Sequence, residues 1–279
     1  MKKLALSLII LAFIISGITL IVNYKTNEGL VNTQQTHQKN QKNVAEENPK
    51  DHMKSQEKKK KEAPHKRKKK RLVITIDPGH QLKANVGQEP EAPHSLQTKY
   101  KATVGSIGIT TKRPEYAVTL EAAKKLSAQL KKKGFKTILT RHTNDVDLSN
   151  VERTKQANKN KSFLYIRIHA DGAENPNASG FSVIAPAKNE HTTSFYKESK
   201  WAAEDILKQV SHRTDIYQNG ISYRGDQAGF NWSKVPVVLV ELGFLTNPND
   251  EKRLLDRDKL DKLTVDIAKG VEIYSKRKK

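Results

Sequence analysis

The chain of 279 residues contains no cysteine. Without thiols it can form no disulfide, no metal site with thiolate ligands and no lipid anchor on an N-terminal cysteine. Any metal ligands must therefore come from histidine and carboxylate side chains. Acidic residues are also few, since 30 Asp and Glu stand against 51 Lys and Arg, which gives a formal net charge of +21. This excess of positive charge points to anionic surroundings or an anionic partner.

A long uncharged run covers residues 4–22, directly after Lys2 and Lys3. A helix needs about 20 residues to cross the hydrocarbon core of a bilayer, so the run is long enough. A cleaved signal peptide has a shorter apolar core and ends in small residues, whereas this run ends in VNYK. We therefore expect residues 1–22 to be a signal anchor that spans the cell membrane as a helix, with secretion after cleavage as the alternative. The two lysines favour a cytoplasmic N-terminus, which places the rest of the chain outside the cell.

Residues 23–71 have the composition of a disordered linker. They have almost no aliphatic residue after Val44, so they cannot bury enough apolar surface to offset the entropy lost on folding. The run from Lys58 to Arg71 contains ten Lys or Arg and one acid, Glu62. Because this run is expected outside the cell, nucleic acid is not a candidate partner, and anionic cell-surface polymers or lipid headgroups are. The alternative is a solvated spacer that binds nothing.

The pattern of residues 72–279 predicts one α/β domain, in which strands and helices alternate along the chain. The expected strands are 72–76, 137–139, 163–168, 180–185 and 236–240, and the expected helices are 114–133, 149–158, 195–210 and 260–274. Such alternation predicts a largely parallel β-sheet with helices on both faces. Residues 82–112 are polar and interrupted by Gly and Pro, so we expect a long functional loop there. We expect the protein to be a monomer.

Three polar side chains stand at the ends of expected strands. His80 lies in the run ITIDPGHQ after the first strand, His169 follows the third strand in YIRIHADG, and Glu241 follows the apolar run PVVLV. Because the carboxyl ends of parallel strands share one edge of a sheet, these side chains can converge there. Glu115, in the first turn of the first long helix, is a fourth candidate.

Two histidines and one glutamate are a common ligand set for catalytic zinc, with a fourth position left for water. Such a site also needs a carboxylate that does not bind the metal and that moves the proton of the water to the leaving group. The four candidates meet both needs.

Each candidate also has a structural explanation. A histidine at a strand end is often a turn residue, and Glu115 could compensate the helix dipole. Glu241 is harder to explain in this way, because a carboxylate after five apolar residues needs a buried partner. His94, in the loop of residues 82–112, is a competitor for the metal.

Several motifs together resemble one family. DPGH, PEYAVTL, SNVERTKQAN, IRIHADG and VVLVELGFLTNPND resemble, in this order, the motifs of the zinc-dependent N-acetylmuramoyl-L-alanine amidases of the third amidase family, which are bacterial cell-wall hydrolases. The resemblance spans about residues 72–275. It implies a twisted, mostly parallel sheet, one zinc ion held by His80, Glu115 and His169, and Glu241 as the catalytic carboxylate. It also implies hydrolysis of the amide between the lactyl group of N-acetylmuramic acid and L-alanine of the peptidoglycan stem peptide.

The chain departs from the usual family pattern at three points. Gln81 follows DPGH where a glycine is usual, and the insertion at residues 82–112 can cover or reshape the substrate groove. The third motif reads IRIHADG in place of SIHAN, which puts Arg167 on the same face as His169 if the strand continues. We expect Arg167 either to pair with an acid or to contact the substrate.

Two other functions fit parts of this pattern. A zinc peptidase that cuts within the stem peptide would use the same metal ligands. A non-catalytic wall-binding or regulatory protein would be expected to lack a ligand or the catalytic carboxylate, and the sequence retains all four residues. The sequence therefore predicts a membrane-anchored peptidoglycan amidase that faces the cell wall.

Overall fold

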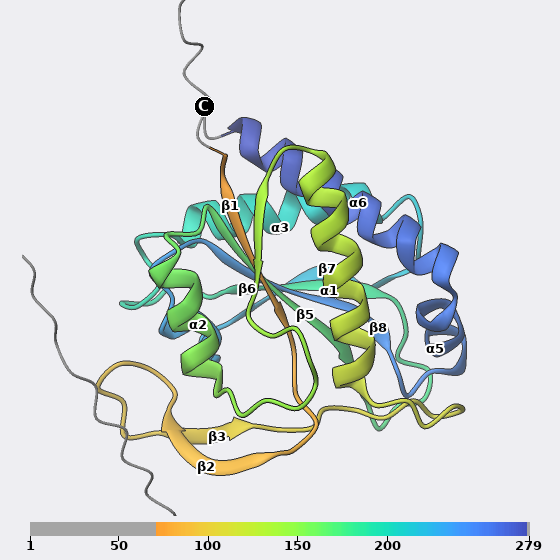
Figure 1. The fold of residues 1–279 in the computed structure, drawn as a ribbon, viewed down its shortest axis with the longest axis horizontal. Coiled ribbons are helices and arrows are strands. Elements are labelled where there is room, and N and C mark those ends of the chain that lie inside the picture. The colour runs from red at the N-terminus through yellow and green to blue at the C-terminus, as the bar shows by residue number, and fades with distance from the viewer. Residues whose placement is uncertain (1–70, 278–279) are drawn as a thin grey trace, which may run out of the picture. The chain divides into compact units, whose positions relative to one another are not determined.

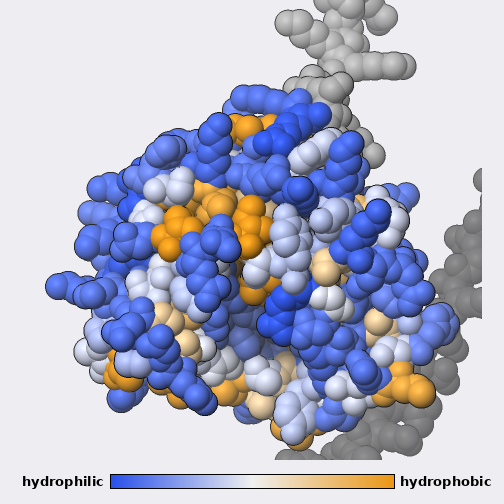
Figure 2. All heavy atoms as spheres, turned by 180° about the vertical axis from the view of Figure 1, so that it is seen from behind, coloured by the Kyte–Doolittle hydropathy of each residue, from blue (hydrophilic) through white to orange (hydrophobic). Residues whose placement is uncertain are grey.

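The computed structural model describes residues 71–277. The expected membrane anchor at residues 1–22 and the linker up to residue 70 lie outside this range. Within it, no helix combines the length and the apolar character that a membrane crossing needs. The described surface is mostly hydrophilic in the view of Figure 2, with hydrophobic residues in separate patches.

A six-stranded sheet forms the centre of the domain, and all neighbouring strands are parallel except β6 and β8, which are antiparallel. This confirms the predicted α/β domain with a largely parallel sheet (Figure 1). In spatial order the strands are β4 (Lys136–Leu139), β1 (Val73–Pro78), β5 (Leu164–Asp171), β8 (Val237–Phe244), β6 (Phe181–Pro186) and β7 (Ile216–Arg224).

Helices cover both faces of the sheet, as predicted, and α1 and α2 lie on opposite sides in Figure 1. The larger core lies under α1 (Glu115–Lys132), α3 (Tyr196–Val210) and α6 (Arg257–Arg277). A smaller core lies on the other face, under α2 (Asn150–Lys159) and the short α4 (Ala228–Asn231). Helix α5 (Pro248–Leu255) follows β8 and contacts α6.

Local sequence signals explain where two helices begin. Ser149 caps α2 by accepting a hydrogen bond from the backbone N–H of Glu152, whose side chain accepts one from the N–H of Ser149. This is the predicted capping box. Pro114 is the N-cap of α1 and has an extended backbone with a ψ of 148°, so Glu115 is the first helical residue.

The expected long loop at residues 82–112 contains a pair of strands that the sequence did not predict. An antiparallel pair, β2 (Asn85–Pro90) and β3 (Thr98–Ala102), forms there. Its residues are mostly exposed, so the apolar periodicity that marks a strand is weak. Contacts from distant residues hold it instead, and Glu89 of β2 accepts hydrogen bonds from the backbone N–H of Val151 in α2.

The strands that carry the site are longer than predicted. β5 continues to Asp171 and β8 to Phe244, so His169 and Glu241 lie within strands and not after them. Polar side chains at these positions end the apolar pattern, but the pairing of β5 with β8 continues through His169 and Glu241 and, after an irregularity, to Asp171 and Phe244. The pattern also missed β7, α4 and α5.

Candidate metal centre

Three of the predicted residues meet at the carboxyl ends of β1 and β5. His80 Nε2 lies 3.2 Å from Glu115 Oε1, and His169 Nδ1 lies 3.1 Å from both of these atoms. Tetrahedral zinc with bonds of 2.0–2.1 Å separates its ligand atoms by about 3.3 Å, so the three atoms suit a shared ion. Among residues 71–277 this is the one such cluster of His and acidic side chains, and His94 is not part of it.

The ionisation of these groups suits a metal. Burial alone would raise the pKa of Glu115, but hydrogen bonds and charge interactions with His169 and His80 outweigh it and hold the pKa far below its usual range. Burial lowers the pKa of His169 to about 4, against the opposing effect of its hydrogen bond to Glu115. At neutral pH, Glu115 is therefore anionic and His169 neutral, the forms that bind metal ions.

The insertion at residues 82–112 orients His80. The Nδ1 atom of His80 lies 3.1 Å from the carbonyl oxygen of Thr103 and 2.9 Å from its hydroxyl oxygen. If Nδ1 carries the proton and donates it to Thr103, then Nε2 presents its lone pair to the centre. His80 itself has a φ of 61°, a strained value for a residue with a side chain, which is common at functional sites.

The same segment holds Glu115. The backbone N–H of Ser106 donates to Glu115 Oε2 at 2.8 Å, and the N–H of Ala170 donates to Oε1 at 3.0 Å. A Cβ atom on Gly105, whose φ is 81°, would lie 2.5 Å from Glu115 Oε2 and 2.7 Å from a ring carbon of His80. Thr103, Gly105 and Ser106 are not recognisable as site residues from the sequence, because only the glycine suggests a close approach of the backbone.

Glu241 stands beside His169 in the parallel register of β5 and β8. It is buried, and its Oε2 atom has no hydrogen-bond partner in the described part of the chain. Burial raises the pKa of Glu241 well above its usual value, and the nearby Asp171 and Glu115 add to the shift. A buried carboxyl with a free oxygen next to a ligand set is suited to accept and return a proton.

Residues 74–273 match the sequence model of a family described as N-acetylmuramoyl-L-alanine amidase. The chain belongs to this family. It is 30% identical over 202 residues to the probable cell wall amidase LytH of Staphylococcus aureus, and the match covers 72% of this chain but only 58% of LytH.

Solved structures of amidases share the fold. The amidase Ami1 of Mycobacterium smegmatis is 27% identical with a TM-score of 0.66, over 74% of this chain and 97% of Ami1. Ami1 of Mycobacterium abscessus is 25% identical with a TM-score of 0.63, over 73% of this chain and 98% of that protein.

Two departures from the usual amidase pattern lie in one buried network below the metal centre. Gln81 is 1% exposed, and its Oε1 accepts hydrogen bonds from Arg153 and from the backbone N–H of Leu148. It therefore joins the turn after β1 to the segment that leads into α2. Arg167 pairs with Asp77 at 3.1 Å, so one of the two expectations for Arg167, an ion pair with an acid, describes its contact.

Asp77 is the residue that the other members of this network bond. It is fully buried, and its two oxygens accept hydrogen bonds from Arg153, Arg167, Thr140 and Tyr165. Burial alone would raise the pKa of Asp77, but Arg153 and Arg167 outweigh it and keep the group ionised. Asp77, near the end of β1, therefore anchors the buried network below the metal centre.

Proposed function

We propose that the protein is a zinc-dependent N-acetylmuramoyl-L-alanine amidase that hydrolyses the amide between the lactyl group of N-acetylmuramic acid and L-alanine of the peptidoglycan stem peptide. One observation supports it most directly. The ligand atoms of His80, Glu115 and His169 lie 3.1–3.2 Å apart, and Glu241 stands in register beside His169. Membership of the amidase family supports the substrate class.

The residues divide the chemistry between them. Zinc held by the three ligands would polarise the scissile carbonyl and lower the pKa of a water molecule towards about 7. Glu241 would accept the proton of the attacking water at Oε2 and deliver it to the departing alanine nitrogen. Thr103 and Ser106 would keep His80 and Glu115 in place during turnover, because they bond the atoms that face away from the centre.

The metal assignment can be tested by zinc content. We expect about one zinc per chain in the purified full-length protein, measured by elemental mass spectrometry, and its loss in His80→Ala. His94→Ala is the matched control, because His94 lies in the same insertion but outside the cluster, and it should keep its zinc. Equal zinc content in both variants would refute the ligand set.

The bond cleaved can be tested on purified peptidoglycan. An amidase releases intact stem peptides and leaves glycan strands with free lactyl carboxyl groups, and mass spectrometry of the products detects both. The alternative, a zinc peptidase that cuts within the stem, would leave shortened peptides on muramic acid. A non-catalytic wall-binding protein would release neither product.

We also propose a location. The uncharged residues 4–22 would anchor the protein in the cell membrane, and residues 23–71 would carry the catalytic domain into the cell wall. The basic run from Lys58 to Arg71 would bind anionic wall polymers. Deletion of this run should weaken binding to purified walls at low salt more than at high salt, because salt screens exposed charges. Equal binding with and without the run at low salt would remove this part of the proposal.

A further inference from the structure

Below the metal centre, two buried arginines, Arg153 and Arg167, share a single carboxylate, Asp77. Arg153 Nη1 lies 3.0 Å from Asp77 Oδ1, and Arg167 Nε lies 3.1 Å from Asp77 Oδ2. One carboxylate thus serves two buried guanidinium groups. The other two groups that bond Asp77, Thr140 and Tyr165, are hydroxyls without charge. In the described part of the chain, no second carboxylate lies within ion-pair distance of Arg167.

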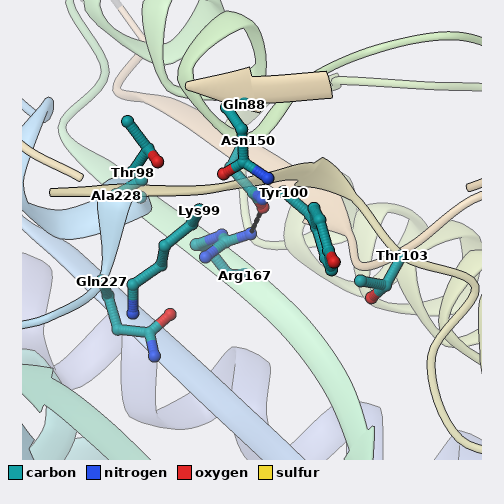
Figure 3. Close-up of a pocket in the computed structure, with 10 residues that line it drawn as sticks. Gln88, Thr98, Lys99, Tyr100, Thr103, Asn150, Arg167, Gln227 and Ala228 are labelled. Atoms are coloured by element: carbon teal, nitrogen blue, oxygen red, sulfur yellow. Dashed lines mark hydrogen bonds between the residues drawn. The ribbon is translucent and has the colours of Figure 1, made fainter. Parts of the chain in front are cut away.

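Arg167 also faces a pocket. The pocket has a volume of about 520 Å³ and lies between the β2–β3 pair, the N-terminus of α2 and the start of α4 (Figure 3). Arg167 Nε bonds Asp77 and Nη2 bonds Asn150 at 2.8 Å, whereas Nη1 has no acceptor among residues 71–277. A Cβ atom on Gly229 would lie 2.5 Å from Nη1, so only glycine leaves room beside this nitrogen.

The rest of the pocket suits an anion. Lys99 from β3 reaches into it, with its Nζ 3.3 Å from Asp226 and 3.5 Å from Glu91 at the rim. Among residues 71–277, no Asp or Glu lines the pocket itself. Amide and hydroxyl groups make up most of the remaining wall and can donate further hydrogen bonds; they belong to Gln88, Thr98, Tyr100, Thr103, Asn150 and Gln227. Thr103 also bonds His80, so the pocket adjoins the metal centre.

We infer that this pocket is a substrate subsite that binds a carboxylate of the stem peptide through Arg167, with Lys99 at its rim. The inference rests on the proposed function, since it concerns the same substrate. A carboxylate would receive a charge-assisted hydrogen bond from Nη1 and would balance the second guanidinium group on Asp77. Converting that carboxylate into a carboxamide would remove the charge and leave Arg167 without its partner. The pocket therefore distinguishes free-acid from amidated stem peptides.

The experiment compares soluble muramoyl-peptides in pairs. Within a pair the peptides are identical except that one stem carboxylate is free in one member and a carboxamide in the other, and each carboxylate of the stem is tested in turn. The full-length wild-type protein should cleave the free-acid member about 10–100-fold more efficiently in kcat/KM for at least one pair. In Arg167→Gln this ratio should fall towards one, mainly through a higher KM for the free acid.

Two further variants distinguish a direct effect on substrate binding from a general effect on the structure. Lys99→Gln changes a side chain that is 36% exposed and should lower the same ratio by a smaller factor, with the fold retained. Lys83→Gln removes another lysine of the insertion outside this pocket and should leave the ratio unchanged. Thermal unfolding checks that each variant is folded.

The possible outcomes are distinct. Equal cleavage of both members in every pair by the wild type would overturn the subsite and leave the amidase function standing. An unchanged ratio in folded Arg167→Gln would overturn the role of Arg167. If Tyr100→Ala slowed both members equally while Arg167→Gln changed no ratio, the pocket would bind the neutral glycan, which also overturns the inference. Failure to cleave any member at the muramoyl–alanine bond would refute the proposed function and the subsite with it.

Discussion

The two faces of the central sheet differ in character, although the same strands supply both. Each covers an apolar core, and the side of α2 and α4, the more polar face, also carries the buried network of Asp77, Arg153 and Arg167. On the α1, α3 and α6 side, β5 contributes Leu164, Ile166 and Ile168 to the larger core. The alternate residues of β5 are Tyr165, Arg167 and His169, which face the side of α2 and α4 because successive side chains of a strand point to opposite faces. One strand thus carries an apolar row and a polar row.

The two faces contribute differently to the stability of the fold and to the chemistry of the site. The apolar face buries aliphatic side chains at nearly zero exposure, which stabilises the fold through the hydrophobic effect. The polar face buries charges, which cost free energy unless they are paired. Asp77 is paired with two arginines, but Glu241 keeps an oxygen without a partner. An unpaired buried carboxyl is a liability for folding and an advantage for proton transfer.

Glu241→Gln should have the largest effect on activity, and it should separate the contribution of Glu241 to catalysis from its contribution to stability. Loss of a group that transfers protons lowers kcat by about 10²–10⁴-fold. The free energy of unfolding should not fall, because the substitution removes a buried ionisable group that lacks a partner for Oε2. Kinetics on peptidoglycan and urea unfolding of the same sample measure both. Wild-type rates in the variant would remove Glu241 from the mechanism.

Asp77→Asn should show that the polar face contributes stability when its charges are paired. Removing one partner of a buried ion pair costs about 3–5 kcal/mol. The pKa of Asp77 is held well below 3.8, so its contribution is fully present above about pH 5 and is lost progressively as the pH falls through 3.8 towards the lower pKa of the folded state. Urea unfolding of wild type and variant between pH 6 and pH 3 measures both effects, and the difference between the two proteins should shrink towards the acid end. A constant difference would contradict the role of the ionised carboxylate.

Leu126→Ala probes the apolar face. Leu126 is fully buried in the larger core, and truncating such a side chain costs about 2–5 kcal/mol. Zinc content and kcat should stay at wild-type levels at temperatures well below unfolding, because α1 meets the site only at its first turn. A large loss of kcat in the folded variant would show that the two faces are coupled.

Gly79→Ala should have the smallest effect, and one confined to the metal centre. The added Cβ atom would lie 2.4–2.7 Å from the ring atoms of His169 and would displace the ring. Zinc affinity should fall about 10–100-fold, measured by competition with a chelating dye. Gly134→Ala is the control: it lies at the C-terminal end of α1 with a φ of 87° and with no neighbour near its Cβ position, so it should lower stability and leave zinc affinity unchanged.

Much of this protein was determined by local sequence. The order of the predicted strands and helices, the capping box at Ser149 and the positions of His80, Glu115, His169 and Glu241 follow from patterns a few residues long. Alternation within β5 even assigns Arg167 and His169 to one face. These features could be predicted because hydrophobic periodicity and capping act over neighbouring residues.

Only the tertiary structure decided the rest. The segment from Thr103 to Ser106 holds His80 and Glu115 in place by hydrogen bonds. It lies, however, in an insertion whose mostly exposed β2–β3 pair has only weak apolar periodicity. Asp77 looks like a turn residue in sequence, but in the fold it holds Arg153 and Arg167 from strands and helices far along the chain. The physical reason is that buried charges take their partners from whatever the fold brings close, and sequence separation does not reveal which residues those are.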